Sequence, residues 1–172
     1  MESKQPEKDE SKINEGKMGI QFPPPAVFNP SKSICKIVIP TKTSSGFFIK
    51  FFKGEEDFFC LMTNEHMITK QLIEKKVIIS LYYDNETRVK EIQLNTNERY
   101  IKEFTEIGID ATVVEIISKD NISKDFFLLS FIDYMDSFDD LLDKQITIIQ
   151  YPKGGPLSYA DGKIVKSSIF KR

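Results

Sequence analysis

From residue 33 onward, short runs of apolar, β-branched or aromatic residues alternate with polar turn residues. Runs of about four to eight such residues between turns are typical of β-strands. They predict strands at 34–39, 46–52, 58–63, 77–83, 89–94, 99–104, 111–117 and 145–151, and a last strand that begins at 162. Short strands at this spacing favour an antiparallel barrel or sandwich over βαβ units, so the predicted fold class is all-β.

Two segments have a helical pattern, and the N-terminal end has neither a strand pattern nor a helical one. Residues 67–75 and 134–142 are the helix candidates. Residues 1–17 hold five acidic residues, four lysines and almost no apolar side chains, which predicts disorder because too little surface can be buried. Residues 21–30 contain four prolines and predict an extended lead-in. We therefore expect an N-terminal tail over 1–32.

The segment 133–144 is acidic, with five Asp interleaved with Phe138, Leu141 and Leu142. A solvated connection with a few apolar anchors is the favoured interpretation. The alternative is an acidic site for a cation or a partner, although the segment lacks the glycine and the ligand spacing of a calcium loop.

Charge and hydropathy argue against two classes of partner, nucleic acids and membranes. The sequence has 24 basic and 26 acidic residues along the chain and a formal net charge of −2. No basic stripe indicates nucleic-acid binding. No apolar run approaches the roughly 18–20 residues that span a bilayer, and the charged N-terminus differs from a signal peptide. We expect no nucleic-acid partner, no membrane partner and a cytoplasmic location.

Cys35 and Cys60 are the only cysteines, and each lies in an apolar run. Two buried free thiols are favoured, as in a reducing intracellular compartment, and a single disulfide stays open as the alternative. With one histidine, two cysteines and no CxxC or HxxxH spacing, the sequence predicts no metal site and no cofactor.

The single histidine, His66, follows the predicted strand 58–63 in the turn TNEHMI. A lone histidine is commonly structural, but a strand end can hold an imidazole rigidly with one edge open to a cleft. Imidazole has an ordinary pKa close to neutral, as a general base requires. Asp110 opens the predicted strand 111–117, where an aspartate either ends a turn or accepts an imidazole N–H. Because the two residues are far apart in sequence, only the fold can pair them.

Four sequence blocks resemble the trypsin-like serine peptidases, particularly their disulfide-free intracellular and bacterial members. SSGFFIK resembles the family's GSGF(I/V) strand, CLMTNEHMI resembles LTNAHVV around the catalytic histidine, and IDATVVEI resembles DIALLKV, which begins with the catalytic aspartate. ITIIQYPKGGPLSYADGKIV resembles the start of the family's second barrel. The blocks follow the family's order over residues 44–165. The resemblance implies a chymotrypsin-like fold of two six-stranded Greek-key barrels, with His66 as general base and Asp110 as orienting carboxylate.

The family's nucleophile turn, GNSGG or GSSGSP, has no counterpart in this sequence. In the family that turn supplies the catalytic serine and the oxyanion hole. Ser158 is a weak substitute because glycines precede it and none directly follows it. Ser167 and Ser168 are weak substitutes because they lie where a strand is expected. The nucleophile serine is therefore absent from the predicted site.

The four sequence blocks also divide the part of the chain after the N-terminal tail into three segments. We expect a complete first barrel over 33–117, a loose connection over 118–144 and an incomplete start of a second barrel over 145–172. Such an incomplete barrel would expose apolar faces and unpaired strand edges.

The principal hypothesis is a relative of the trypsin-like serine endopeptidases that is truncated before its nucleophile and inactive by itself. Whether the chain is an enzyme therefore stays open. The first alternative is a non-catalytic module that binds a peptide at exposed strand edges by β-augmentation. The second alternative is complementation by another chain that carries the missing strands and the serine. The partner in each case is a polypeptide, while cleavage specificity and oligomeric state stay open.

Overall fold

The part of the chain that the computed structural model describes, residues 30–53, 56–129 and 142–165, consists mainly of β-strands. The strands are β1 (Ile34–Ile39), β2 (Lys42–Lys53), β3 (Glu56–Thr63), β4 (Ile78–Tyr83), β5 (Arg88–Gln93), β6 (Ile101–Glu103), β7 (Thr112–Glu115), β8 (Leu128–Leu129), β9 (Gln145–Gln150) and β10 (Ser158–Lys163). The helices are α1 (Lys70–Glu74) and the 3-10 helices η1 (Pro30–Ser33), η2 (Thr105–Ile107), η3 (Ser118–Asp120), η4 (Lys124–Phe126) and η7 (Pro152–Gly154). The all-β character expected from the sequence is confirmed.

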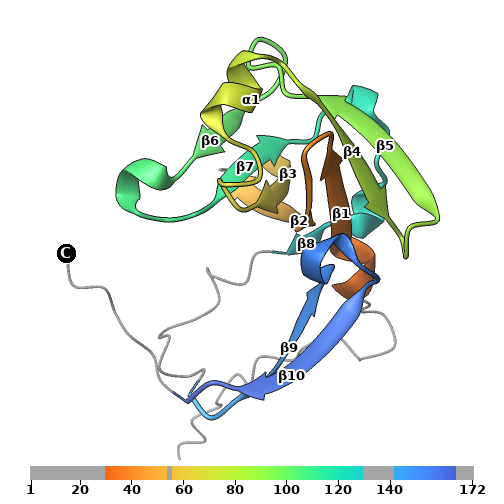
Figure 1. Ribbon diagram of the computed structural model, residues 1–172, viewed down its shortest axis with the longest axis vertical. Helices are drawn as coiled ribbons and strands as arrows, with labels where there is room; N and C mark the ends of the chain where they lie inside the picture. Colours follow the sequence, from red (N-terminus) through yellow and green to blue (C-terminus); the bar gives the residue numbers. More distant parts are fainter. Residues whose placement is uncertain (1–29, 54–55, 130–141, 166–172) are drawn as a thin grey trace, which may run out of the picture.

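Seven strands form one curled antiparallel sheet in the order β5-β4-β1-β2-β3-β7-β6 (Figure 1). β8 joins it as a short parallel neighbour of β2, opposite Ile49 and Lys50. β1, β2 and β3 are linked as consecutive hairpins, whereas β4 returns after α1 to pair with β1. β9 and β10 form a separate two-stranded sheet. The large sheet is a half-barrel.

The alternation of side chains along β1 explains why the sheet has one buried face. Cys35, Ile37 and Ile39 are buried on that face, and the residues between them are half-buried. Gly46 lies opposite Cys35 on β2, and a Cβ atom there would lie 2.6 Å from Ile37 Cδ1. Glycine therefore permits this close approach between β1 and β2. The other core side chains are Phe48, Leu61, Met67, Ile68, Ile79, Leu81, Tyr83, Ile92, Leu94, Val114, Ile116 and Phe126.

Several predicted elements differ from the structure. β2 begins at Lys42 rather than at 46, because it pairs with the full length of β1. The last strand begins at Ser158 rather than at 162, because it pairs with the full length of β9. The helix covers only Lys70–Glu74, because the residues before it form a turn closed by the Asn64 carbonyl. The helix candidate 134–142 and the disordered tail 1–17 fall on residues outside the described ranges, apart from position 142.

The start of the connection after β7 is packed onto the large sheet, so the expectation of a loose segment is wrong for residues 118–129. Phe126 is buried in the core. The Phe127 ring lies 5.3 Å from the Phe48 ring and 4.9 Å from the Phe59 ring, centroid to centroid. Aromatic packing thus extends the core past β7.

No helix in the described part of the chain is long and apolar enough to cross a membrane.

Tyr151 fixes the β9–β10 hairpin to the large sheet. Its backbone N–H donates to Ser45 Oγ (2.7 Å), and its buried ring lies 5.4 Å from Lys36 Nζ. Farther from this anchor, the Ile146 and Ile148 side chains are exposed. The hairpin is therefore attached at one end and poorly covered beyond it, which matches the exposed apolar hairpin expected from the sequence.

Tyr151→Phe is expected to leave the free energy of unfolding unchanged, or to raise it by about 1 kcal/mol. The Tyr151 hydroxyl is buried without a hydrogen-bond partner among the described residues, and burial raises the pKa of Tyr151 to about 12. Tyr151→Ala removes the whole ring and is expected to cost about 3–5 kcal/mol. Urea unfolding measures both effects. A loss above about 1 kcal/mol in Tyr151→Phe would mean that the hydroxyl is bonded in solution.

Candidate functional site

His66 lies in a tight turn between β3 and α1, and the two residues after it are buried. The N–H groups of Met67 and Ile68 both donate to the Asn64 carbonyl, at 3.1 and 3.3 Å. Thr112 Oγ1, from β7, donates to the Ile68 carbonyl at 3.1 Å. With Met67 and Ile68 packed in the core, the preceding side chain points outward, and the His66 side chain is 67% exposed.

The register of β3 and β7 explains why Asp110 lies beside His66. Thr63, the last residue of β3, is opposite Thr112, the first residue of β7. The chain leaving β3 and the chain entering β7 therefore meet at the same end of the sheet. Ala111 is buried just before β7, and Asp110 precedes it at the surface. The fold thus brings together the two residues that the sequence blocks single out.

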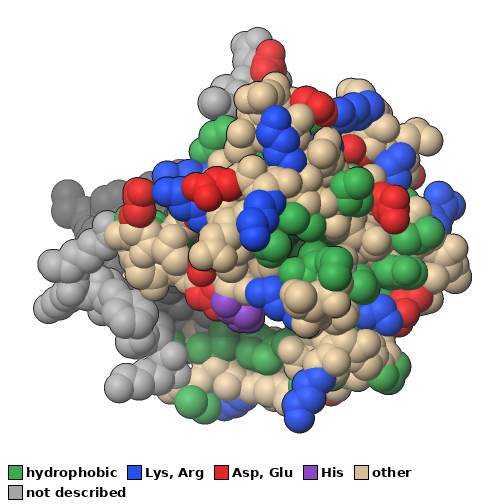
Figure 2. Space-filling view, turned by 45° about the horizontal axis from the view of Figure 1, so that its top comes forward, with side chains coloured by type: hydrophobic (Ala, Val, Ile, Leu, Met, Phe, Trp, Pro, Cys, Tyr) green, Lys and Arg blue, Asp and Glu red, His purple; other side chains and the backbone are tan. Residues whose placement is uncertain are grey.

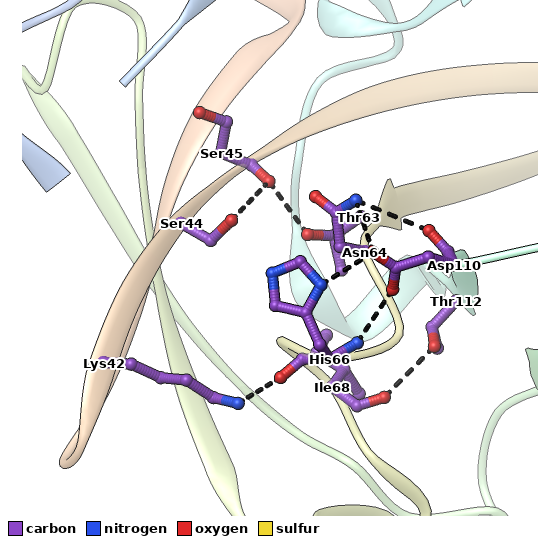
Figure 3. Close-up of polar contacts among 9 residues, drawn as sticks. All are labelled: Lys42, Ser44, Ser45, Thr63, Asn64, His66, Ile68, Asp110 and Thr112. Atoms are coloured by element: carbon purple, nitrogen blue, oxygen red, sulfur yellow. Dashed lines mark hydrogen bonds and ion pairs between the residues drawn. The ribbon is translucent and has the colours of Figure 1, made fainter. Parts of the chain in front are cut away.

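Three donor groups converge on the Asp110 carboxylate (Figure 3). His66 Nδ1 lies 2.7 Å from Asp110 Oδ2, and the His66 backbone N–H donates to Oδ1 at 3.0 Å. Asn64 Nδ2 donates to Oδ2 at 3.2 Å and to the Asp110 carbonyl oxygen at 3.4 Å. An ionised carboxylate can only accept hydrogen bonds, so Nδ1 carries the proton. In the neutral imidazole, Nε2 is then the unprotonated nitrogen.

Hydrogen bonds hold the pKa of Asp110 below its ordinary value. The backbone N–H of His66 makes the largest contribution, partial desolvation opposes it, and the His66 and Asn64 side chains add to the lowering. Asp110 is therefore ionised throughout the neutral range, as an acceptor for an imidazole N–H must be.

His66→Ala is expected to leave the pKa of Asp110 below its ordinary value, because the largest single contribution, the backbone N–H of residue 66, stays in place. At pH values above the ordinary titration range of Asp, the carboxylate is ionised and stabilises the turn. This stabilisation is lost as the pH falls through the lowered pKa of Asp110. Titration of the Asp110 carboxyl carbon by NMR measures the pKa in wild type and variant. Return of the pKa of Asp110 to its ordinary value in His66→Ala would show that the imidazole is the main cause of the lowered pKa.

No described residue is hydrogen-bonded to the outer ring nitrogen of this pair. His66 Nε2 has no hydrogen-bond partner within residues 30–53, 56–129 and 142–165. Ser158 Oγ donates instead to the Pro156 carbonyl at 3.1 Å. Ser167 and Ser168 lie outside the described residues.

Both cysteines are buried free thiols, which confirms the favoured prediction. Burial raises the pKa of Cys60 to about 12 and also raises the pKa of Cys35. Thiols that stay protonated are poor nucleophiles and poor metal ligands. Within the described ranges, no group of three or more His, Cys, Asp or Glu is arranged to hold a metal ion.

A groove of about 260 Å³ lies between the large sheet and the hairpin. Asn64 and Asp110 line it on the sheet side, and Ile148, Ile149 and Gln150 of β9 line it on the hairpin side. Figure 2 shows the histidine at the rim of a hollow, with apolar side chains on the opposite wall. The site therefore opens onto a cleft between the two sheets.

Asn64 is the site residue that sequence reasoning misses. Its contact with Asp110 depends on the register of β3 and β7, which the sequence pattern does not specify. The available sign is the asparagine two residues before His66, which stands where the family block LTNAHVV also has an asparagine. Lys42 Nζ, which donates to the His66 carbonyl, is likewise placed by the fold alone.

Comparison with known proteins gives no family assignment, because the chain matches no protein-family model, no curated protein and no solved structure.

Proposed function

We propose that the chain is a relative of the trypsin-like serine endopeptidases, with His66 as general base and Asp110 as the carboxylate that orients it. The contact of 2.7 Å between Nδ1 and Oδ2, together with the unpartnered Nε2 among the described residues, carries the proposal. In a serine peptidase the carboxylate fixes the imidazole tautomer, so that the other ring nitrogen can take the proton of the nucleophile. The contact between Asp110 and Nδ1 supports the first task, fixing the tautomer, and the unpartnered Nε2 among the described residues supports the second, taking the proton.

The strand order supports the same proposal. A Greek-key motif places its fourth strand beside its first, in the spatial order 4-1-2-3. β4, β1, β2 and β3 lie in that order, and β5 and β6 are the two ends of the curled sheet. Pairing of those ends would close the sheet into a barrel of seven strands, one more than the six-stranded barrel that the resemblance implies.

The proposal does not extend to peptide hydrolysis by this chain alone. Loss of the serine from an intact triad costs about a million-fold in turnover, and the remaining rate comes from the oxyanion hole and substrate binding. The sequence lacks the family's nucleophile turn, which also supplies the oxyanion hole. His66 and Asp110 would therefore need a serine and an oxyanion hole from another polypeptide segment.

Hydrolysis of p-nitrophenyl acetate tests whether His66 is an accessible base. This activated ester needs no serine, because an unprotonated imidazole nitrogen promotes its hydrolysis directly. We expect hydrolysis by the wild type at neutral pH and the background rate in His66→Ala, because His66 is the only histidine. Equal rates in the two proteins would remove the basis for a general base at this position.

A fluorophosphonate probe tests whether the chain carries a reactive serine. We expect no labelling of the folded wild-type chain. Labelling that Ser158→Ala, Ser167→Ala or Ser168→Ala abolishes would identify a nucleophile and would make the chain a complete enzyme, contrary to the proposal.

A second candidate function is peptide binding by the β9–β10 hairpin without catalysis. Ile146 and Ile148 expose an apolar face, and neither outer edge of the hairpin pairs with another described strand. An extended peptide can add to such an edge through main-chain hydrogen bonds. Binding of extended apolar peptides that Ile148→Lys abolishes would favour this function, and an absence of binding to the wild type would exclude it.

A further inference from the structure

The geometry assigns a role to Asn64: it is a positioning residue that holds the Asp110 carboxylate against Nδ1 of His66. This inference rests on the proposed function, because it concerns the same pair of side chains. It adds a residue whose side chain acts on His66 only through Asp110.

Asn64 bridges the side chain and the backbone of Asp110. Its Nδ2 lies 3.2 Å from Oδ2 and 3.4 Å from the Asp110 carbonyl oxygen. A side-chain amide nitrogen carries two hydrogens in a fixed plane, so it can donate to both oxygens at once. Two bonds to two parts of one residue restrict the side-chain torsion of that residue. Because the Asp110 side chain is 51% exposed, water would otherwise compete for the carboxylate.

Each oxygen of the Asp110 carboxylate has a hydrogen-bond donor other than the imidazole. The His66 backbone N–H donates to Oδ1 at 3.0 Å. The Asn64 Nδ2 group donates to Oδ2, in addition to the contact that Oδ2 makes with the imidazole. The Asn64 hydrogen bond is also among the contributions that lower the pKa of Asp110. With both oxygens held, the carboxylate faces Nδ1 without relying on the imidazole itself.

The backbone of Asn64 is fixed by its place at the end of β3. The Asn64 carbonyl accepts from the N–H groups of Met67 and Ile68, which close the turn. The preceding residue, Thr63, is paired in the sheet, and its Oγ1 donates to the Ser45 carbonyl at 2.8 Å. Asn64 therefore presents its amide from a rigid position, as a positioning residue must.

Loss of the Asn64 amide would allow the carboxylate to rotate toward solvent. The Nε2–H tautomer, which is the more stable one for a histidine side chain in water, would then gain population. The backbone N–H of His66 would still hold Oδ1, so the change is partial. We expect the ratio of the Nδ1–H to the Nε2–H tautomer to fall about fivefold, as for loss of one exposed hydrogen bond.

The test is the ¹⁵N chemical shifts of the two ring nitrogens in histidine-labelled full chain, at a pH where the imidazole is neutral. A protonated and an unprotonated ring nitrogen have well separated shifts, and the chain has one histidine. Asn64→Ala and Asn64→Leu, which is close to Asn in size, are both expected to lower the tautomer ratio about fivefold. Asn97→Ala removes an exposed amide whose side chain makes no hydrogen bond among the described residues, and it is expected to leave the ratio unchanged.

The outcomes separate this inference from the proposed function. A wild type with Nδ1–H, together with unchanged ratios in both Asn64 variants, would overturn the role of Asn64 and leave the pair of His66 and Asp110 standing. A wild type with Nε2–H would overturn both. An equal fall in Asn97→Ala would show a general effect of surface substitution and would also overturn the role. Far-UV circular dichroism confirms folding, which the exposed Asn64 side chain is not expected to affect.

Discussion

Asp120→Ala is expected to lower the free energy of unfolding by about 3–5 kcal/mol, because it leaves a buried guanidinium without its counter-ion. Arg99 and Asp120 form a two-pronged pair, with Nη1 2.8 Å from Oδ2 and Nη2 2.9 Å from Oδ1. Their side chains are only 2% and 4% exposed. Asp120 Oδ2 also accepts from the Ile117 backbone N–H at 2.9 Å, so the variant loses that bond as well. Urea unfolding measures the loss.

Two control variants separate the buried charge from general damage. Lys119→Ala breaks the neighbouring exposed pair with Glu98 and is expected to cost about 0–1 kcal/mol. The double variant Arg99→Met/Asp120→Leu removes both charges and is expected to be more stable than Asp120→Ala alone, because no unpaired charge remains. If Asp120→Ala costs no more than Lys119→Ala, the pair is not buried in solution.

Asp110→Asn is expected to slow the hydrolysis of p-nitrophenyl acetate at least about tenfold, against about 10⁴-fold in turnover for this change in an intact triad. The His66 backbone N–H is a fixed donor and keeps an oxygen at the position of Oδ1, so the new NH₂ group faces Nδ1 and displaces the Asn64 amide from that position. Nδ1 then accepts instead of donating, and the proton moves to Nε2. The outward nitrogen can no longer act as a base.

Glu106→Gln is the matched control for Asp110→Asn. Glu106 is exposed on η2, four positions before Asp110, and its substitution removes the same charge. We expect its rate of ester hydrolysis to equal that of the wild type. A wild-type rate in Asp110→Asn would show that the carboxylate does not select the tautomer, whereas a slow rate in Glu106→Gln would point to the overall charge near the site.

Most strand positions follow from the sequence because alternation has a direct physical cause. β1 at Ile34–Ile39 coincides with its predicted run, since a β-branched run between turns fits a strand that buries alternate side chains. The start of β10 does not follow from the sequence, because Ser158–Lys163 has weak strand propensity and is extended by its pairing with β9. The apolar residues Met67 and Ile68 suggested a longer helix, but they anchor a turn in the core.

The site could be predicted in its residue types but not in its supporting contacts. His66 and Asp110 are marked by the sequence blocks, and the match of Thr63 with Thr112 brings them together. The bond from Asn64 to Asp110 spans 46 residues and depends on that same register. Pairing at such separations is a property of the folded sheet, so a local pattern cannot reveal it.

The most direct test of the central claim is the protonation of the single imidazole in the wild-type chain. ¹⁵N NMR at a pH where His66 is neutral reports each ring nitrogen separately. A protonated Nδ1, bonded to Asp110, and an unprotonated Nε2 are the predicted result, as the contact of 2.7 Å requires. A protonated Nε2, with Asp110 turned away from the ring, would contradict the assignment of His66 and Asp110 as a base and its orienting carboxylate.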